Sequence, residues 1–160
     1  MKKLICAPVL ALALLTLAAQ TGRAPDGIVV WKAADLKAYA GKLAPRVASP
    51  QKIATQTLAN LNGNNVMMVH REATGEAEFH ENAADFMVIV DGEANLVLGG
   101  TIPDGKTTGP GETRGTTIEG GKTYAVEPGD IVNIPAKTPH QVVIAPGKHI
   151  TCFLLKVAAK

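Results

Sequence analysis

Cysteine is nearly absent from this sequence: Cys6 and Cys152 are the only two in 160 residues. Cys6 lies in an apolar segment that we expect to be removed, as argued below. A mature chain would then keep Cys152 alone, and no internal disulfide can form. Cys152 sits in an apolar run, and nothing nearby in the sequence would lower its pKa, so we interpret it as a buried, inert thiol.

Clusters of basic side chains are also lacking. The chain has 16 Lys and Arg against 14 Asp and Glu, and loss of residues 1–19 would remove two lysines and leave 14 of each sign. Nucleic-acid binding requires clustered Lys and Arg that neutralise phosphates. The sequence therefore predicts no nucleic-acid partner.

The apolar run near the N-terminus, residues 4–19, is short for a membrane span, which needs about 20 apolar residues. Lys2 and Lys3 precede it, Pro8 interrupts it, and small and polar residues follow it, an order typical of a secretory signal peptide. We expect residues 1–19 to be cleaved, with a cut as late as residue 24 as the alternative. The mature protein would then be periplasmic or secreted, with no membrane attachment.

The rest of the chain predicts one helix followed by strands. Residues 35–43 carry apolar side chains at helical spacing and end at Pro45, which indicates a short helix within an N-terminal extension, residues 25–50. From residue 51 to 160, short apolar or alternating runs are separated by Gly, Asn and Pro turns. The expected strands are 51–58, 66–72, 77–80, 85–90, 93–98, 123–126, 131–134, 140–144 and 149–157.

Many short strands with regular turns predict an all-β domain, a sandwich or a barrel. Residues 99–117 are rich in Gly, Thr and Pro, and we expect them to form a long surface loop.

The segment EFHENAADFMVIVDG, residues 78–92, places ligand-type side chains at the entrance to an apolar strand. On an extended backbone Glu78 and His80 point to one face, while Phe79 points to the other. A second segment, GDIVNIPAKTPH, ends at His140 after two prolines that fix a turn.

These two segments resemble the cupin superfamily, whose motifs can be written G-x5-H-x-H-x(3,4)-E-x6-G and G-x5-P-x-G-x2-H. Gly129, Pro135 and His140 match the second motif, with Lys137 in place of its glycine. In the first motif His80 matches the second histidine. The leading glycine of the motif falls on Gly75, three residues closer to the histidine positions than in the family pattern. Glu78 falls on the first histidine, Asp85 on the glutamate and Gly92 on the closing glycine.

The resemblance covers about residues 66–157 and implies a cupin-type antiparallel β-barrel, or jelly roll, with both motifs meeting inside one open end. It also implies a divalent metal held by Glu78, His80, Asp85 and His140, or by Glu78, His80 and His140 alone if Asp85 binds only through water. Glu78 stands where the family has histidine, and Asp85 is one methylene shorter than the family's glutamate. Such a set of two histidines and two carboxylates suits Mn, Fe(II) or Zn.

Three further residues are pocket candidates. His70 lies on an earlier strand, where a satisfied or partly exposed histidine is the alternative. Glu112 and Arg114 lie in the expected loop, where they either contact a ligand at the mouth of the barrel or form a salt bridge.

Two functions remain open at this point. The first is a metal-dependent enzyme acting on a small polar molecule, with the metal as Lewis acid or oxygen binder. The second is a non-catalytic cupin that binds a small ligand. Cupins commonly pair, and the apolar strand 149–157 would suit a homodimer.

Overall fold

The computed structural model describes residues 27–48 and 50–159, so the predicted signal peptide lies outside the described residues. The chain divides into two units, residues 1–30 and 31–160. Of the first unit only residues 27–30 are described, and they contain no helix or strand. The second unit holds every element discussed below. Among the described residues, none of the helices has the length and hydropathy that crossing a membrane requires.

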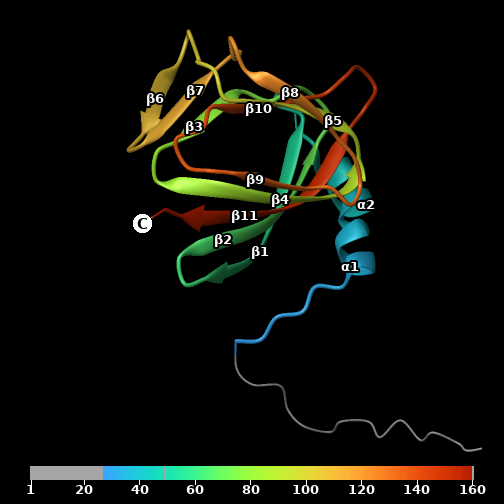
Figure 1. The fold of residues 1–160 in the computed structure, drawn as a ribbon. Helices are drawn as coiled ribbons and strands as arrows, with labels where there is room; N and C mark the ends of the chain where they lie inside the picture. Colours follow the sequence, from blue (N-terminus) through green and yellow to red (C-terminus); the bar gives the residue numbers. More distant parts are fainter. Residues whose placement is uncertain (1–26, 49, 160) are drawn as a thin grey trace, which may run out of the picture. The chain divides into compact units, whose positions relative to one another are not determined.

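Two antiparallel sheets make up most of the second unit (Figure 1). The first sheet has five strands in the order β1 (Ile53–Leu61), β2 (Asn64–Arg71), β11 (Ile150–Ala158), β4 (Ala83–Gly92) and β9 (Ile131–Ile134). β11 is hydrogen-bonded on both sides, to β2 and to β4. It therefore offers no free edge to a second chain, and a homodimer stays a prediction.

The second sheet has six strands in the order β6 (Lys106–Gly109), β7 (Glu112–Gly115), β3 (Ala77–His80), β10 (His140–Val143), β5 (Ala94–Leu98) and β8 (Lys122–Val126). β6 and β7 form a hairpin inside the segment expected to be a loop, so that expectation was wrong for residues 106–115. The hairpin pairs with β3 through four residue pairs, and this pairing orders a stretch whose composition alone indicates a loop.

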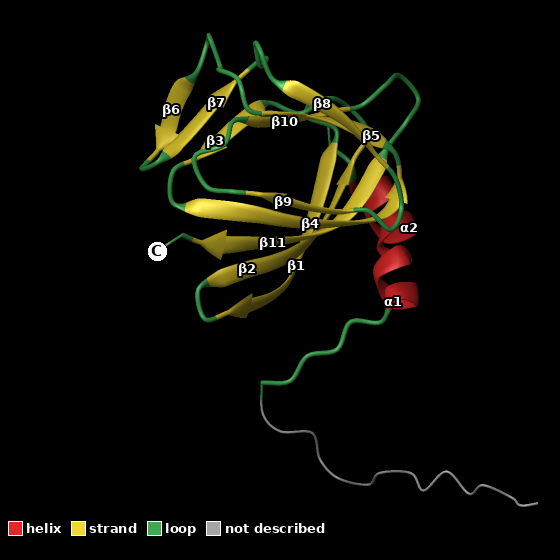
Figure 2. Cartoon of the chain, viewed as in Figure 1, coloured by secondary structure: helices red, strands yellow, loops and turns green. Residues whose placement is uncertain are grey.

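The two sheets face each other, as the strands in Figure 2 show, but they do not close into the barrel that the sequence predicted. Within residues 27–48 and 50–159, no strand of one sheet pairs with a strand of the other. A barrel requires continuous hydrogen bonding around its circumference. Here the four edge strands, β1 and β9 in one sheet and β6 and β8 in the other, have no described partner in the opposite sheet, so the correct description is two facing sheets.

An apolar core fills part of the space between the sheets. Its buried members are Met87, Ile89, Ala94, Leu96, Val126, Ile134, Ile144, Ile150 and Cys152. Strand alternation accounts for the six members on β4, β5 and β11, because every second residue of these strands faces this space.

A second cluster lies on the other face of the first sheet, where the helical segment packs. The helical segment consists of α1 (Ala33–Lys37), α2 (Tyr39–Leu43) and a 3-10 turn (Ala44–Arg46) that includes Pro45. Leu43 is completely buried against Ala54 and Met68. The predicted helix is thus present in two short pieces joined at Ala38, and its packing places it in the same unit as the sheets.

Candidate metal centre

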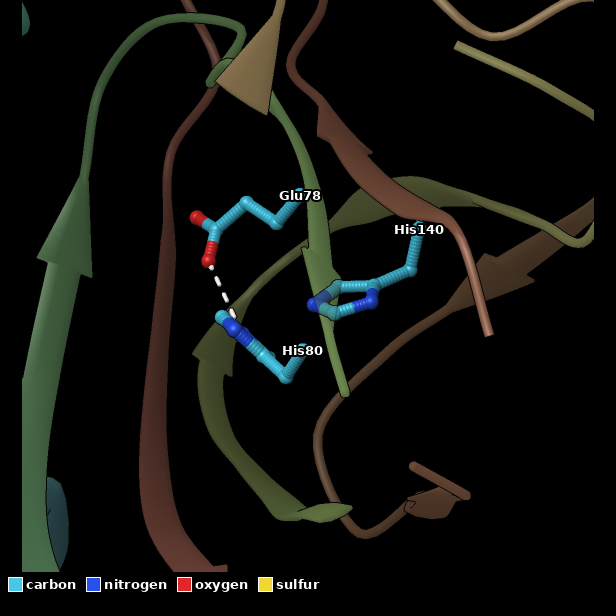
Figure 3. Close-up of side chains that lie close together, drawn as sticks. All are labelled: Glu78, His80 and His140. Atoms are coloured by element: carbon cyan, nitrogen blue, oxygen red, sulfur yellow. Dashed lines mark ion pairs between the residues drawn. The ribbon is translucent and has the colours of Figure 1, made fainter. Parts of the chain in front are cut away.

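Three side chains from two neighbouring strands of the second sheet converge between the sheets. Glu78 and His80 lie on the same face of β3, and β10 pairs with β3 so that His140 lies opposite Glu78. One ligand atom from each residue lies within 4.8 Å of the other two. Figure 3 shows the three side chains turned toward one another, and Glu78 Oε2 is 3.3 Å from His80 Nε2.

Both imidazole rings are held through their Nδ1 atoms. Glu112 Oε2 lies 2.7 Å from His80 Nδ1, and the carbonyl oxygen of Thr138 lies 2.9 Å from His140 Nδ1. These acceptors place the proton of each ring on Nδ1 and leave Nε2 facing the centre. Outer hydrogen bonds of this kind orient the histidine ligands of protein metal sites.

Glu78 is held from the other side by Arg114, whose Nη2 lies 3.4 Å from Glu78 Oε2. Arg114 Nη1 also lies 3.1 Å from Glu112 Oε2. Burial alone would raise the pKa of Glu78, but the hydrogen bond with His80 and the charge of Arg114 lower it to about 2. Glu78 is therefore an anion at neutral pH and able to bind a cation.

Asp85, on β4 of the facing sheet, lies alongside this group. Its Oδ2 is 3.6 Å from His80 Nε2 and 3.5 Å from His140 Nε2. Burial would raise its pKa, but the two histidines and Lys156 hold the pKa well below its usual range. The carboxylate is charged and faces both imidazoles, although it is not one of the three residues that share the close mutual spacing.

Lys156 is a cation already present at the site. Its Nζ lies 2.7 Å from His80 Nε2 and 2.9 Å from Asp85 Oδ1, because Lys156 and Asp85 are directly paired between β11 and β4. Burial alone would lower the pKa of His80, but Asp85 and Glu78 raise it to about 9. An imidazolium Nε2 would donate to these carboxylates, whereas an ammonium at 2.7 Å needs a lone pair on the same nitrogen. The 2.7 Å contact therefore requires the neutral ring with its proton on Nδ1, whereas the two carboxylates favour the charged ring.

The donor set fits a divalent metal. Two ligand atoms bound at about 2.1 Å to a tetrahedral ion lie about 3.4 Å apart, close to the Glu78–His80 separation. The ammonium of Lys156 stands in for a cation between an imidazole nitrogen and a carboxylate. Two imidazoles and one carboxylate suit Mn, Fe(II) or Zn. A metal at this position would have to displace the lysine ammonium from His80.

The site opens onto a cavity of about 190 Å³ between the sheets. Glu78, Asp85, Arg114, His140 and Lys156 line one part of its wall, and His80 lies buried behind them. A larger hollow of about 490 Å³, lined by Glu93, Glu127, Asp130 and Lys148 among others, has no histidine in its wall. The cavity between the sheets is therefore the better candidate for a ligand site.

The structure brings two of the three predicted pocket residues to the site. Glu112 and Arg114 lie on β7, beside β3, where they contact His80 and Glu78. His70 does not reach the cavity. Strand alternation turns it to the opposite face of β2, where its Nδ1 lies 2.7 Å from Thr151 Oγ1.

Two charged residues of the cavity wall, Lys156 and Arg71, were not among the predicted site residues. The signal available for each was a basic residue within or just after an apolar run, on β11 and on β2. His70 is instead buried and hydrogen-bonded, which is the alternative given for it above, and its neighbour Arg71 takes the cavity face of β2.

Comparison with known proteins finds structures with a similar fold and gives no information about the activity of this chain. No family model matches the chain, and no curated protein matches it. Among solved structures, the protein TT1209 from Thermus thermophilus has a TM-score of 0.51 at 14% identity, covering 72% of this chain and 94% of that chain.

Two further structures fall below a TM-score of 0.5, and no inference about this chain rests on them. The polyketide cyclase RemF from Streptomyces resistomycificus has a TM-score of 0.47 at 21% identity, covering 68% of this chain. Rru_A2000 from Rhodospirillum rubrum, a cupin-2 domain, has a TM-score of 0.48 at 18% identity, covering 69% of this chain. The match spans 66% of RemF and 62% of Rru_A2000, less than two thirds of each.

The fold consists of two facing antiparallel sheets, and the ligand-type residues of the two sequence segments meet between them.

Proposed function

We propose that this chain is a small cupin that binds a divalent metal ion through Glu78, His80 and His140 and acts on a small polar molecule in the adjoining cavity. The observation that carries the proposal is the orientation of the two rings. Both Nδ1 atoms are engaged by acceptors, so both Nε2 atoms face the same point as the Glu78 carboxylate. The metal, when bound, would supply a Lewis acid or a site for oxygen.

The surrounding residues of the chain have separate roles in this proposal. Glu112 keeps His80 in the tautomer that presents Nε2. Arg114 bridges Glu78 and Glu112 and so holds both carboxylates in place. Lys156 lies where it can donate a proton into the cavity or balance the charge of an anionic ligand.

A non-catalytic binding protein is the second candidate, and Lys156 is the observation that favours it. Its ammonium supplies a cation to His80 and Asp85, so the site is electrostatically satisfied in the absence of a metal. Such a cupin would hold a small ligand without chemistry at a metal.

Metal titration distinguishes the two candidates. Protein treated with EDTA would be titrated with Mn, Fe(II) under anaerobic conditions, and Zn. The proposal expects one ion per chain and loss of binding in His80→Ala and His140→Ala. His149→Ala is the matched control, since His149 pairs with Asp91 away from the cavity. Absence of binding to the wild type would favour the second candidate. A turnover screen against diketones, catechols, phenolic acids and sugar derivatives would then test for catalysis.

We also propose that the mature protein begins after residue 19, or as late as after residue 24, and is periplasmic or secreted. The order of charged, apolar and small residues in the first 24 positions supports this proposal. Mass spectrometry of the periplasmic or secreted fraction tests it, and an intact N-terminus in a cytosolic fraction would contradict it.

A further inference from the structure

Arg71 lines the wall of the cavity, and among the described residues no carboxylate pairs with it. It ends β2, and alternation turns it to the cavity face together with Met67 and Val69, while Met68 and His70 face the opposite side. Among residues 27–48 and 50–159, its guanidinium forms no ion pair and no side-chain hydrogen bond. The other two basic residues of the cavity wall are both paired, Lys156 with Asp85 and Arg114 with Glu78.

The backbone beside Arg71 leaves room for its guanidinium. A Cβ atom at Gly75 would lie 2.5 Å from Arg71 Nη1, so any larger residue there would push the guanidinium aside. Gly75 cannot easily move instead, because its N–H donates to the carbonyl of Val142 and its carbonyl accepts from Gln141 Nε2. The guanidinium therefore has a defined place against a fixed strip of backbone.

Leaving a guanidinium without a partner in a mostly apolar cavity is unfavourable. The walls around it include Met67, Val69, Met87, Val142, Ile150 and Leu154. Burial lowers the pKa of Arg71, which reflects the cost of removing its charge from water, while the charge of Glu78 raises it. A ligand anion would offset this cost, because a carboxylate accepts two parallel hydrogen bonds from a guanidinium.

The net charge of the cavity wall also favours an anionic ligand. Arg71, Arg114 and Lys156 carry three positive charges, and Glu78 and Asp85 carry two negative charges. The wall thus has an excess of one positive charge, and a bound divalent ion would add two more.

The size of the cavity limits the ligand. A cavity of about 150 Å³ with apolar walls holds a benzene molecule. The present cavity, about 190 Å³, has room for a body of that size with one small polar group.

We propose that this cavity binds a small monocarboxylate with an apolar body, up to about the size of benzoate, and that Arg71 recognises its carboxylate. The inference deepens the proposed function by naming the ligand class of the same cavity. It does not need a bound metal.

Benzoate and benzyl alcohol form the test pair, because they share the ring and differ in the anionic group. Calorimetric titrations would use the metal-free protein first and the metal-loaded protein second. We expect wild type to bind benzoate about 10-fold or more tightly than benzyl alcohol. Arg71→Met should weaken benzoate binding about 10- to 100-fold and leave benzyl alcohol unchanged. Arg71→Lys should keep part of the preference for benzoate over benzyl alcohol, because lysine retains the positive charge but lacks the planar guanidinium that donates two parallel hydrogen bonds.

Arg46→Met is the matched control, since it removes the same charge from an arginine whose side chain is bonded to Gln56 and the backbone of Thr55. Gly75→Ala keeps the charge of Arg71 but displaces the guanidinium, and it should also weaken benzoate binding. If Arg71→Met does not fold, the affinity of Gly75→Ala for benzoate tests the proposal in its place.

Equal affinity of Arg71→Met and wild type for benzoate would overturn the proposal. Equal affinity of wild type for the two ligands, or no binding of benzoate up to about 10 mM, would do the same. If wild type binds no metal but metal-free protein still prefers benzoate, only the proposed metal-dependent function is contradicted. If wild type binds metal but shows no preference for benzoate, only the proposed carboxylate binding is contradicted.

Discussion

Replacing Lys156 with methionine should tighten metal binding, because the lysine ammonium occupies space that a metal ion needs. Nζ lies 2.7 Å from His80 Nε2, whereas a metal would bind the same nitrogen at about 2.0 to 2.1 Å. The two cations cannot bind that lone pair together. Metal binding must therefore break the Lys156 contact and leave the ammonium nearby.

The magnitude follows from the charges. An ammonium and a divalent ion about 6 Å apart repel by about 1.4 kcal/mol at the dielectric constant of water and by about 5.5 kcal/mol at an effective value near 20. The side chain of Lys156 is 29% exposed, so it can turn toward solvent, and the lower figure applies. A gain of about 1.4 kcal/mol corresponds to about 10-fold tighter binding in Lys156→Met.

The assay is a competition titration of Zn or Mn against a fluorescent chelator, with EDTA-treated wild type and Lys156→Met in one buffer. Lys148→Met removes the same charge from an exposed lysine paired with Glu93 and should leave the metal affinity unchanged. Equal or weaker metal binding in a folded Lys156→Met protein would contradict this prediction. It would mean that Lys156 supports the site rather than competing with the metal.

Three further predictions concern neighbouring features of the site. Glu112→Gln should lower metal affinity by about 10-fold, because it removes the charge that orients His80, while Glu119→Gln on the surface should have no effect in the same titration. Cys152, whose pKa burial raises to about 12, should resist iodoacetamide at pH 8 until the protein is unfolded, and rapid labelling of folded protein in peptide maps would contradict this. The pKa of Glu78 falls from 4.5 to about 2 on folding, so its contribution to the stability of metal-free protein should be complete above pH 4.5 and be lost as pH falls toward 2. In urea unfolding, the stability of Glu78→Gln should therefore depend less on pH in this range than that of wild type. The same dependence of stability on pH in both proteins would contradict this prediction.

The elements that position the site could be predicted because strand alternation and turn residues are local signals. Glu78 and His80 share a face because they are two residues apart, and the prolines before His140 mark the turn that leads into β10. All nine expected strands are present, with ends shifted by a few residues.

The remaining features depend on contacts between distant segments. The β6–β7 hairpin is ordered by pairing with β3, which composition does not reveal, and it supplies Glu112 and Arg114. Lys156 reaches His80 only because β11 pairs with β4 in a register that places it opposite Asp85. Closure of the two sheets into a barrel depends on pairing between their edge strands. The residue pattern within a single strand does not indicate whether that pairing forms.

X-ray absorption spectroscopy of zinc-loaded protein identifies the atoms bound to the metal and so tests whether His80 and His140 hold it together. We expect two imidazole nitrogens at about 2.0 to 2.1 Å together with carboxylate or water oxygens, and loss of one imidazole in His140→Ala. A zinc ion bound by one imidazole or by none in the wild type would contradict this expectation.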